Sequence, residues 1–276
     1  MRTLLVMLLC MLGGQSALAW NGRGHALVAE LAWQALTPEA RADVEALLEG
    51  DLDARGEPSG RDRLTQIASW PDEIREHERA NNPAAYRGWH SRANQVCSEA
   101  LGKCPKGLCV DEIIVTQTQI LADLQRSHRE RNEALKWVVH LVGDLHMPLH
   151  SGEQGAAGSK PAQLSGKKQK SGSTLHTVWD DALLDAAVKG WKIPALDERP
   201  TQPPYSPAEP RRWMLESRDV SRDSVFAGLP GFACGQPTPD QFELDAAYQA
   251  ASVPVIRQQI LLAAQRLAGL LNASLR

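Results

Sequence analysis

The sequence predicts an all-α protein folded as a single domain, and three observations lead to this expectation. Apolar residues recur with helical spacing in most of the chain, most clearly over Asp111–Gln125. No stretch of useful length alternates apolar and polar residues as a half-buried strand does. The 276 residues contain no internal repeat and no domain linker. We therefore expect one multi-helix bundle.

The first two expected helices are marked by small apolar residues and by a cap. Alanine and leucine recur over residues 26–35, directly after His25, which favours a helix. Thr37 is a typical N-cap, and Pro38 suits the first helical position. A second helix should therefore begin there and run to about Leu48.

Loops are expected on both sides of the next helical segment. Residues 50–61 are rich in Gly, Asp and Pro, which favours a loop. Arg63–Glu78 reads as mainly helical, with a kink or a new first turn at Pro71. The following stretch, Asn81–Val110, is irregular and contains three cysteines, so it should be a loop tied by disulfides.

The middle of the chain holds the most apolar expected helix. Helices are predicted over Asp111–Gln125 and Arg131–His146, and Pro148 should end or kink the second. Residues 151–174 are rich in Gly, Ser, Lys and Gln, so we expect a mobile, solvated loop there. An alternative role for its lysines is to help hold a polyanion. Another helix should begin at Leu175.

The C-terminal part should contain two further helices. A Pro-rich loop over 192–207 precedes a helix at Arg211–Ser224. The last helix is predicted over Gln241–Leu271, with a kink at Pro254.

The N-terminal residues have the features of a secretory signal. Arg2 precedes the apolar core Leu4–Leu12, and the small-residue site Ala17–Ala19 suits cleavage. We therefore expect residues 1–19 to be a signal peptide and residues 20–276 to be the mature domain. Its location would be the periplasm or the medium.

Four cysteines would remain in that exported chain, and an even number predicts two disulfides. The sequence permits three pairings, of which we favour Cys104 with Cys109 and Cys97 with Cys234. The alternative, a zinc site made by these thiolates, fits none of the common spacings. The net charge of −3 gives no general attraction for nucleic acid, so polyanion chemistry would need a local site.

The stretch HLVGDLHMPLH, residues 140–150, carries the strongest functional signal. His140 and Asp144 are four residues apart and so share one helix face, and Pro148 should redirect His150. A lone buried histidine is usually a hydrogen-bonded core residue. Burying three such groups without partners would cost several kcal/mol, and a shared metal ion would satisfy all three together. Zinc suits this set of ligands.

Further histidines and aspartates extend this set. His176 and Asp180 repeat the spacing of four. The candidate ligands are His25, Asp72, His90, His140, Asp144, His150, His176 and Asp180. Because none is a thiolate, a hydrolytic zinc cluster fits better than a structural site. Eight ligands imply two or three ions.

These residues lie in motifs that resemble the S1/P1 nucleases, with zinc phospholipase C as a more distant relative. The motifs are Trp20-x4-His25, Trp70-Pro71-Asp72-x2-Arg75, Trp89-His90, His140-x3-Asp144-x5-His150 and His176-x3-Asp180. The resemblance covers nearly the whole of residues 20–276. The cysteine spacing is also similar, which supports the favoured pairing.

The resemblance implies an all-α fold with a cleft that holds three zinc ions. The first ion would be bound by Asp72, His90, His140 and Asp144, and the second by His150, His176 and Asp180. The third would be bound by His25, by Asp144 as a bridge, and by the free amine and carbonyl of Trp20. Cleavage after Ala19 would therefore complete the site, because only a free, deprotonated amine binds zinc.

The resemblance also implies an activity and its substrates. Single-stranded RNA and DNA would be cleaved at the 3′ O–P bond to give 5′-phosphates, and 3′-nucleotides would lose their phosphate. Zinc would activate water, and Arg75 would donate to the phosphoryl oxygens, with Asp144 shared between ions.

Two departures from the family pattern leave the substrate-binding residues unknown. Ser91 follows His90 where an aromatic residue is common, and Gln154–Gly158 replaces an Arg-Gly-Gly-Asn-Asp type of stretch. Two alternatives remain: a phospholipase C-like esterase acting on phospholipid with the same metals, and a non-catalytic zinc-binding protein.

Overall fold

The computed structural model describes residues 20–166, 171–196 and 205–275 and confirms the all-α class. The expected signal peptide, residues 1–19, and the lysines of 167–170 lie outside the described residues. Within the described ranges, no helix combines the length and apolar character that a membrane span requires.

Helices of very different length make up the chain. The helices are α1 (Gly22–Gln34), α2 (Pro38–Leu48), α3 (Leu64–Ile67), α4 (Trp70–Arg79), α5 (Val110–Ala122), α6 (His128–His146), α7 (Pro148–Ser151), α8 (Leu175–Thr177), α9 (Leu184–Val188), α10 (Glu209–Val220) and α11 (Ala246–Ser274). Two π-helical turns, Val178–Leu183 and Ser221–Phe226, extend α8 and α10. The short strands are β1 (Asn94–Gln95), β2 (Gly152–Glu153), β3 (Ala162–Leu164) and β4 (Phe242–Leu244).

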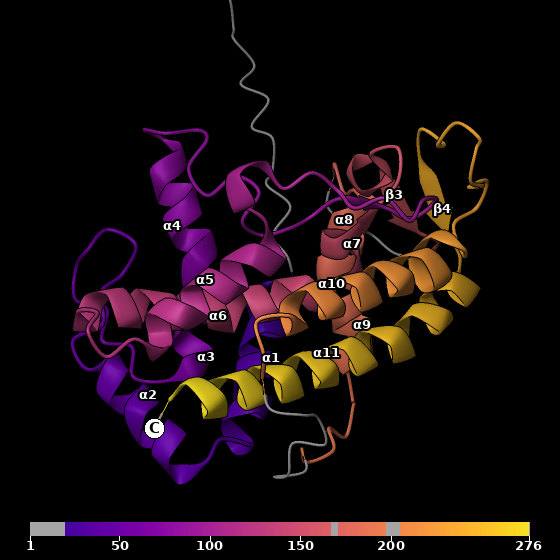
Figure 1. Ribbon diagram of the computed structural model, residues 1–276. Coiled ribbons are helices and arrows are strands. Elements are labelled where there is room, and N and C mark those ends of the chain that lie inside the picture. The colour runs from indigo at the N-terminus through magenta and orange to yellow at the C-terminus, as the bar shows by residue number, and fades with distance from the viewer. Residues whose placement is uncertain (1–19, 167–170, 197–204, 276) are drawn as a thin grey trace, which may run out of the picture.

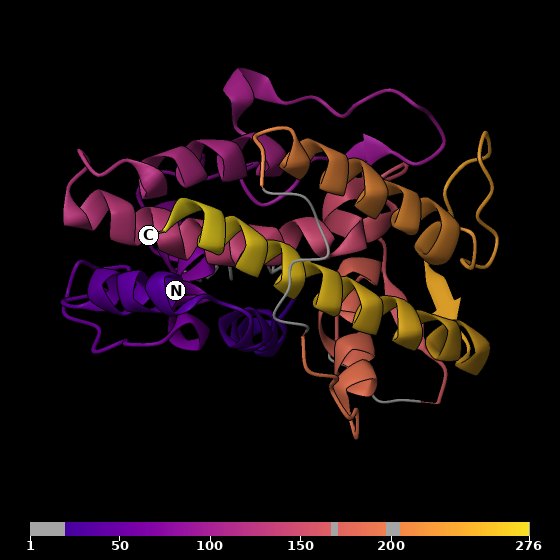
Figure 2. The ribbon, with the colours of Figure 1, turned by 60° about the horizontal axis from the view of Figure 1, so that its bottom comes forward.

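Helix α6 lies at the centre of the bundle. It packs against α1, α4, α5, α10 and α11 (Figure 1). Every residue from Ala134 to His146 is buried. Figure 2 shows α11 crossing the molecule between the α1–α2 pair and α5. Ser127 and Glu130 form a capping box that starts α6. A helix buried on all faces must bury its polar residues too, and these then need partners.

Prolines set the helix boundaries largely as expected. Pro38 is the first residue of α2, and Pro71 lies in the first turn of α4, which is a new helix after α3. Pro148 begins α7 directly after α6 ends at His146. Helix α11 continues as one element through Pro254.

The segment 151–174 corrects one expectation, because part of its described stretch is buried and forms regular structure. Strand β2 pairs with β1, and β3 pairs in parallel with β4, which comes about 80 residues later in the chain. Ala162 and Leu164 of β3 are buried in the core. Strands of two or three residues carry no readable alternation, and their pairing depends on a distant segment, so composition alone gave the wrong answer.

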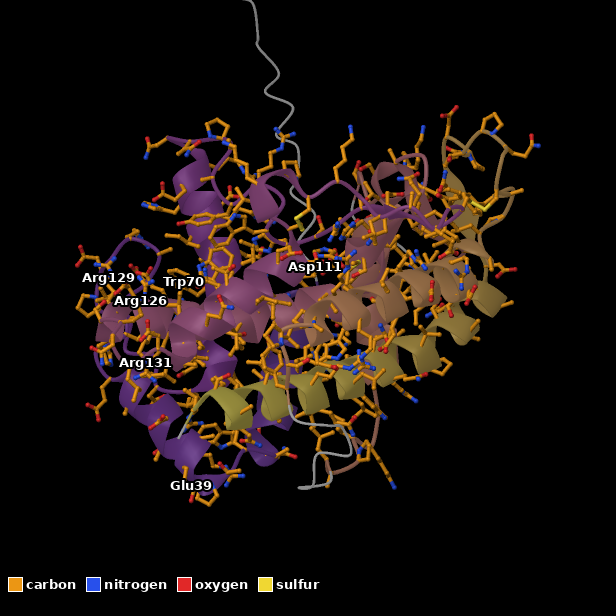
Figure 3. All side chains as sticks on the ribbon, in the orientation of Figure 1. Glu39, Trp70, Asp111, Arg126, Arg129 and Arg131 are labelled. Carbon is orange, nitrogen blue, oxygen red and sulfur yellow. A yellow bond between two sulfur atoms is a disulfide. The ribbon has the colours of Figure 1, made fainter. Side chains whose placement is uncertain are left out.

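Two disulfides and a buried ion pair hold the irregular stretch between α4 and α5. The disulfides join Cys97 to Cys234 and Cys104 to Cys109, which is the favoured pairing. Arg92 Nη1 lies 2.7 Å from Asp111 Oδ2, and both side chains are almost completely buried. Figure 3 labels Asp111. This fixed stretch carries His90.

Candidate metal centre

Five parts of the chain bring the predicted ligands together. Helix α1 supplies His25, α4 supplies Asp72 and Arg75, the loop before β1 supplies His90, α6 and α7 supply His140, Asp144 and His150, and the α8 segment supplies His176 and Asp180. Most of these side chains are buried, while Asp72, Arg75 and His176 remain partly exposed. The cluster is therefore buried on one side and accessible to solvent on the other.

Asp144 is the centre of the cluster, with its side chain fully buried. Its Oδ2 lies 2.8 Å from His90 Nδ1 and 3.2 Å from His140 Nε2. Its Oδ1 lies 3.3 Å from His25 Nε2. His150 Nδ1 is 3.9 Å from Oδ2. One carboxylate therefore faces four imidazoles that come from four different segments.

Asp72 forms a second, overlapping group with two of these histidines. Its oxygens lie 3.8 Å from His90 Nδ1 and 3.7 Å from His140 Nε2, and those two nitrogens are 3.2 Å apart. Tetrahedral zinc with nitrogen ligands separates neighbouring ligand atoms by about 3.3 Å. Two sets can each bring their ligand atoms to one ion, namely His25 with His140 and Asp144, and Asp72 with His90 and His140.

His150, His176 and Asp180 lie together more loosely. His176 Nε2 is 3.5 Å from Asp180 Oδ2, and the rings of His150 and His176 are 4.8 Å apart. The spacing of four between His176 and Asp180 places them on one helix face, as the sequence indicated. These three residues do not form a ligand group as compact as the two around Asp144 and Asp72.

Backbone carbonyls fix the orientation of two imidazoles. His140 Nδ1 lies 2.7 Å from the carbonyl oxygen of Ala68, and His150 Nδ1 lies 2.6 Å from that of His90. Only a protonated Nδ1 can donate to a carbonyl, so Nε2 is the nitrogen of each ring that remains to bind a metal ion. Sequence reasoning missed these partners because a carbonyl carries no side-chain signal.

The electrostatics of the cluster suit a bound cation. Burial alone would lower the pKa of His140, but the carboxylates of Asp144 and Asp72 raise it to about 9. Burial lowers the pKa of His150 to about 4 and keeps that imidazole neutral. Burial, with Asp181 and Asp144 nearby, raises the pKa of Asp180 well above its ordinary value. A cation at Asp180 would restore its carboxylate form.

Unsatisfied polar atoms test whether these residues fit a metal. Several buried nitrogen and oxygen atoms here make no hydrogen bond: Nδ1 and Nε2 of His25, Oδ1 of Asp72, Nε2 of His90, Oδ1 of Asp144, Nε2 of His176, and both carboxylate oxygens of Asp180. Such atoms are costly unless something else satisfies them. Imidazole and carboxylate donors at these separations fit zinc.

Two glycines permit the close packing of the cluster. A Cβ on Gly143 would lie 2.8 Å from His25 Nδ1, so the His25 ring fits here only because residue 143 of α6 has no side chain. A Cβ on Gly24 would lie 2.7 Å from the Cβ of Trp20, which is completely buried. The backbone N–H of Asn21 donates to the carbonyl oxygen of Asp180 at 3.3 Å, which ties this end of α1 to the α8 segment.

The histidines outside the predicted set do not join the cluster. His77 and His128 are exposed. His146 is buried away from the cluster, with Nδ1 against the carbonyl of Val142 at 2.7 Å and Nε2 against Arg266 Nη1 at 2.9 Å.

A cleft of about 320 Å³ opens beside the cluster. His90, His150 and His176 line it together with Arg75, Arg79 and Arg87. Sequence reasoning missed Arg79 and Arg87. The spacing of four between Arg75 and Arg79 was a usable signal for the first, whereas nothing in the sequence marked Arg87.

Comparison with known proteins agrees with this geometry. The S1/P1 Nuclease family model matches residues 20–276. Endonuclease 3 of Arabidopsis thaliana is 30% identical over 178 residues, which are 63% of this chain and 57% of that protein. Nuclease P1 of Penicillium citrinum is 27% identical, with 62% of this chain and 60% of that protein aligned.

Nuclease S1 of Aspergillus oryzae is 24% identical over 94% of this chain and 92% of its own length. The alignments with Endonuclease 3 and Nuclease P1 thus span about three fifths of those relatives. The match of the family model runs through every segment that contributes to the cluster. The chain belongs to the S1/P1 nuclease family.

Proposed function

We propose that this protein is a zinc-dependent nuclease that cleaves single-stranded RNA and DNA to give 5′-phosphates and removes phosphate from 3′-nucleotides. The convergence of four imidazoles on the buried carboxylate of Asp144, beside an open cleft that contains Arg75, carries the proposal. The family is zinc-dependent, and the described residues include two groups that could bind a metal ion.

Three zinc ions are part of the proposal. Asp72, His90, His140 and Asp144 would bind the first, and His150, His176 and Asp180 the second. His25, Asp144 and the amine and carbonyl of Trp20 would bind the third. The contacts of Asp144 with both His25 and His90 support its role as a bridging ligand.

The residues around the cleft suit phosphodiester hydrolysis. Zinc would supply Lewis-acid stabilisation of phosphoryl oxygens and lower the pKa of a water molecule. Arg75 Nη2 lies 2.9 Å from Asp72 Oδ1 without forming a hydrogen bond, so its guanidinium is held beside the ligands and can donate to a phosphoryl oxygen. A duplex would have to unstack to enter such a cleft, which favours single strands.

Export and a single mature domain complete the proposal. Two disulfides are typical of an oxidising compartment, so we place the mature chain, residues 20–276, in the periplasm or outside the cell. The helices from α1 to α11 share one hydrophobic core, which favours one domain.

Zinc analysis and substrate assays of residues 20–276 with a free Trp20 amine test this proposal. We expect about three zinc ions and 5′-phosphate products from single-stranded RNA, with phosphate released from 3′-AMP. Cleavage of phosphatidylcholine alone would favour the phospholipase alternative. One zinc ion or none, without turnover, would favour a non-catalytic protein.

The Asp144→Asn variant tests the shared carboxylate. It should lose more than one zinc ion and most of its activity, because asparagine cannot supply the charge that two ions share. Asp51→Asn is the matched control: this buried aspartate pairs with Lys136 outside the cluster, so the variant should lose stability but keep its zinc. Full zinc content in Asp144→Asn would contradict the bridging role.

A further inference from the structure

The mouth of the cleft is more basic than the chain as a whole. The protein carries a net charge of −3, yet Arg75, Arg79 and Arg87 line the cleft together with three of the candidate zinc ligands. Only Arg75 has a role in the chemistry proposed above. Arg79 and Arg87 therefore add positive charge at the mouth of the cleft, and the proposed chemistry gives neither of them a role.

Helix α4 places Arg79 one turn beyond Arg75 on the same face. Asp72, Arg75 and Arg79 follow one another at spacings of three and four, so their side chains form one stripe. One helical turn raises Arg79 by about 6 Å from Arg75, away from the ligand Asp72. The Arg79 side chain is 37% exposed and contacts Glu76, itself largely exposed, at 3.3 Å. An exposed pair of this kind contributes little and leaves Arg79 available.

The loop that carries Arg87 is held in place on both sides. Tyr86 adopts a left-handed backbone with φ of 53°, and its ring packs 5.0 Å from the rings of both Trp89 and Trp137. Gly88 has φ of 92°, and a Cβ there would lie 2.9 Å from the carbonyl oxygen of Leu108. Arg87 is thus an exposed cation on a fixed turn, which lowers the entropy lost when it binds an anion.

We propose that Arg79 and Arg87 bind backbone phosphates next to the scissile one, so that single-stranded nucleic acid follows a basic track out of the cleft along α4. The inference rests on the proposed function for the position of the scissile phosphate. Guanidinium groups suit such a site because two of their N–H groups can donate to two phosphate oxygens at once. They also stay positively charged throughout the pH range of an enzyme assay. Such contacts bind any sequence, since phosphates carry no base identity.

Equilibrium binding without turnover gives the first test. Zinc-loaded protein is titrated at several salt concentrations with a fluorescently labelled RNA hexamer in its phosphorothioate form, which resists cleavage and keeps the backbone charges. Each phosphate contact contributes about 0.7 to the slope of log affinity against log salt for a single strand. Arg79→Ala and Arg87→Ala should each reduce the slope by about that amount and weaken binding by about fivefold at low salt, whereas Arg87→Lys should recover most of the slope.

The control is Arg126→Ala, which removes an arginine that is 49% exposed, against 37% for Arg79, and that likewise has an acidic partner three residues earlier. Arg126 lies at the turn between α5 and α6 and does not line the cleft (Figure 3). The slope of log affinity against log salt for Arg126→Ala should match that of the wild type. Unchanged slopes in the Arg79 and Arg87 variants would overturn the inference, and so would an equal loss in Arg126→Ala.

Kinetics of the zinc-loaded enzyme give the second test and separate the two proposals. Arg79→Ala and Arg87→Ala should raise KM for the hexamer much more than KM for 3′-AMP, which has no neighbouring phosphate, and should change kcat little. Equal effects on both substrates would overturn the inference while leaving the nuclease proposal intact. A wild-type enzyme that cleaves neither substrate would refute the proposed function, and the binding test would still decide the role of the arginines.

Discussion

Substituting Gly143 by alanine tests whether the close contact between α1 and α6 builds the metal centre. The added Cβ would lie 2.8 Å from His25 Nδ1, whereas ordinary contacts of this kind begin at 3.4 Å, so the His25 ring must move by roughly 0.6 Å. That ring is stacked on His140, with ring centroids 3.9 Å apart, and therefore cannot move without disturbing a second candidate ligand.

The expected costs follow from this displacement. Overpacking a buried site lowers the free energy of unfolding by about 1–3 kcal/mol. The better helix propensity of alanine over glycine offsets about 1 kcal/mol of this loss. The free energy of unfolding should therefore fall by about 1 kcal/mol. Misplaced ligand geometry should weaken zinc binding by roughly 10–100-fold and reduce turnover by about 100-fold. Zinc titration, kcat on 3′-AMP and thermal unfolding measure the three effects.

Gly269→Ala in α11 is the matched control. It makes the same substitution inside a helix, but a Cβ there meets no atom within 4 Å. The control should gain about 0.5–1 kcal/mol of stability and keep its zinc and activity. The reasoning fails if Gly143→Ala also gains stability and retains full zinc binding and turnover.

Three further predictions concern the amino terminus, a buried histidine and the disulfides. A two-residue extension before Trp20 should remove one zinc ion and most turnover, because the amine is then an amide; full activity of the extended protein would refute the third zinc site. Burial and Arg266 lower the pKa of His146 to about 3, so the unfolded state takes up a proton below pH 6.5 that the folded state does not. The wild type should therefore lose about 2 kcal/mol more than His146→Gln between pH 7 and pH 5, measured by urea unfolding, and parallel pH profiles would contradict this. Replacing the Cys97–Cys234 pair by alanines should cost about 5 kcal/mol against about 2 kcal/mol for Cys104–Cys109, because it opens a much longer loop, and equal losses in urea unfolding would refute the loop-length argument.

The fold class and most helices could be predicted because their signals are local. Thr37 and Pro38 mark the start of α2, and Pro148 ends α6, since capping and the missing proline N–H act over a few residues. The two-residue and three-residue strands were missed. Leu164 is buried only because β3 pairs with β4, and no local pattern of three residues can indicate a partner so far away.

The residue types and spacings of the candidate site are likewise local properties, and the sequence by itself determined them. His140 and Asp144 share a face of α6 because an α-helix returns to the same face after four residues. The same rule relates His176 to Asp180. Histidine and aspartate are common zinc ligands, so the residue types alone predicted a zinc site.

Only the tertiary structure decided how these pairs meet and what surrounds them. Asp144 faces imidazoles from α1, the loop before β1, α6 and α7 because those segments pack around one buried helix. The carbonyls that orient His140 and His150, and the position of Arg87 at the cleft, depend on chain segments brought together by folding. Such contacts arise from packing between distant segments, which no local spacing in the sequence encodes.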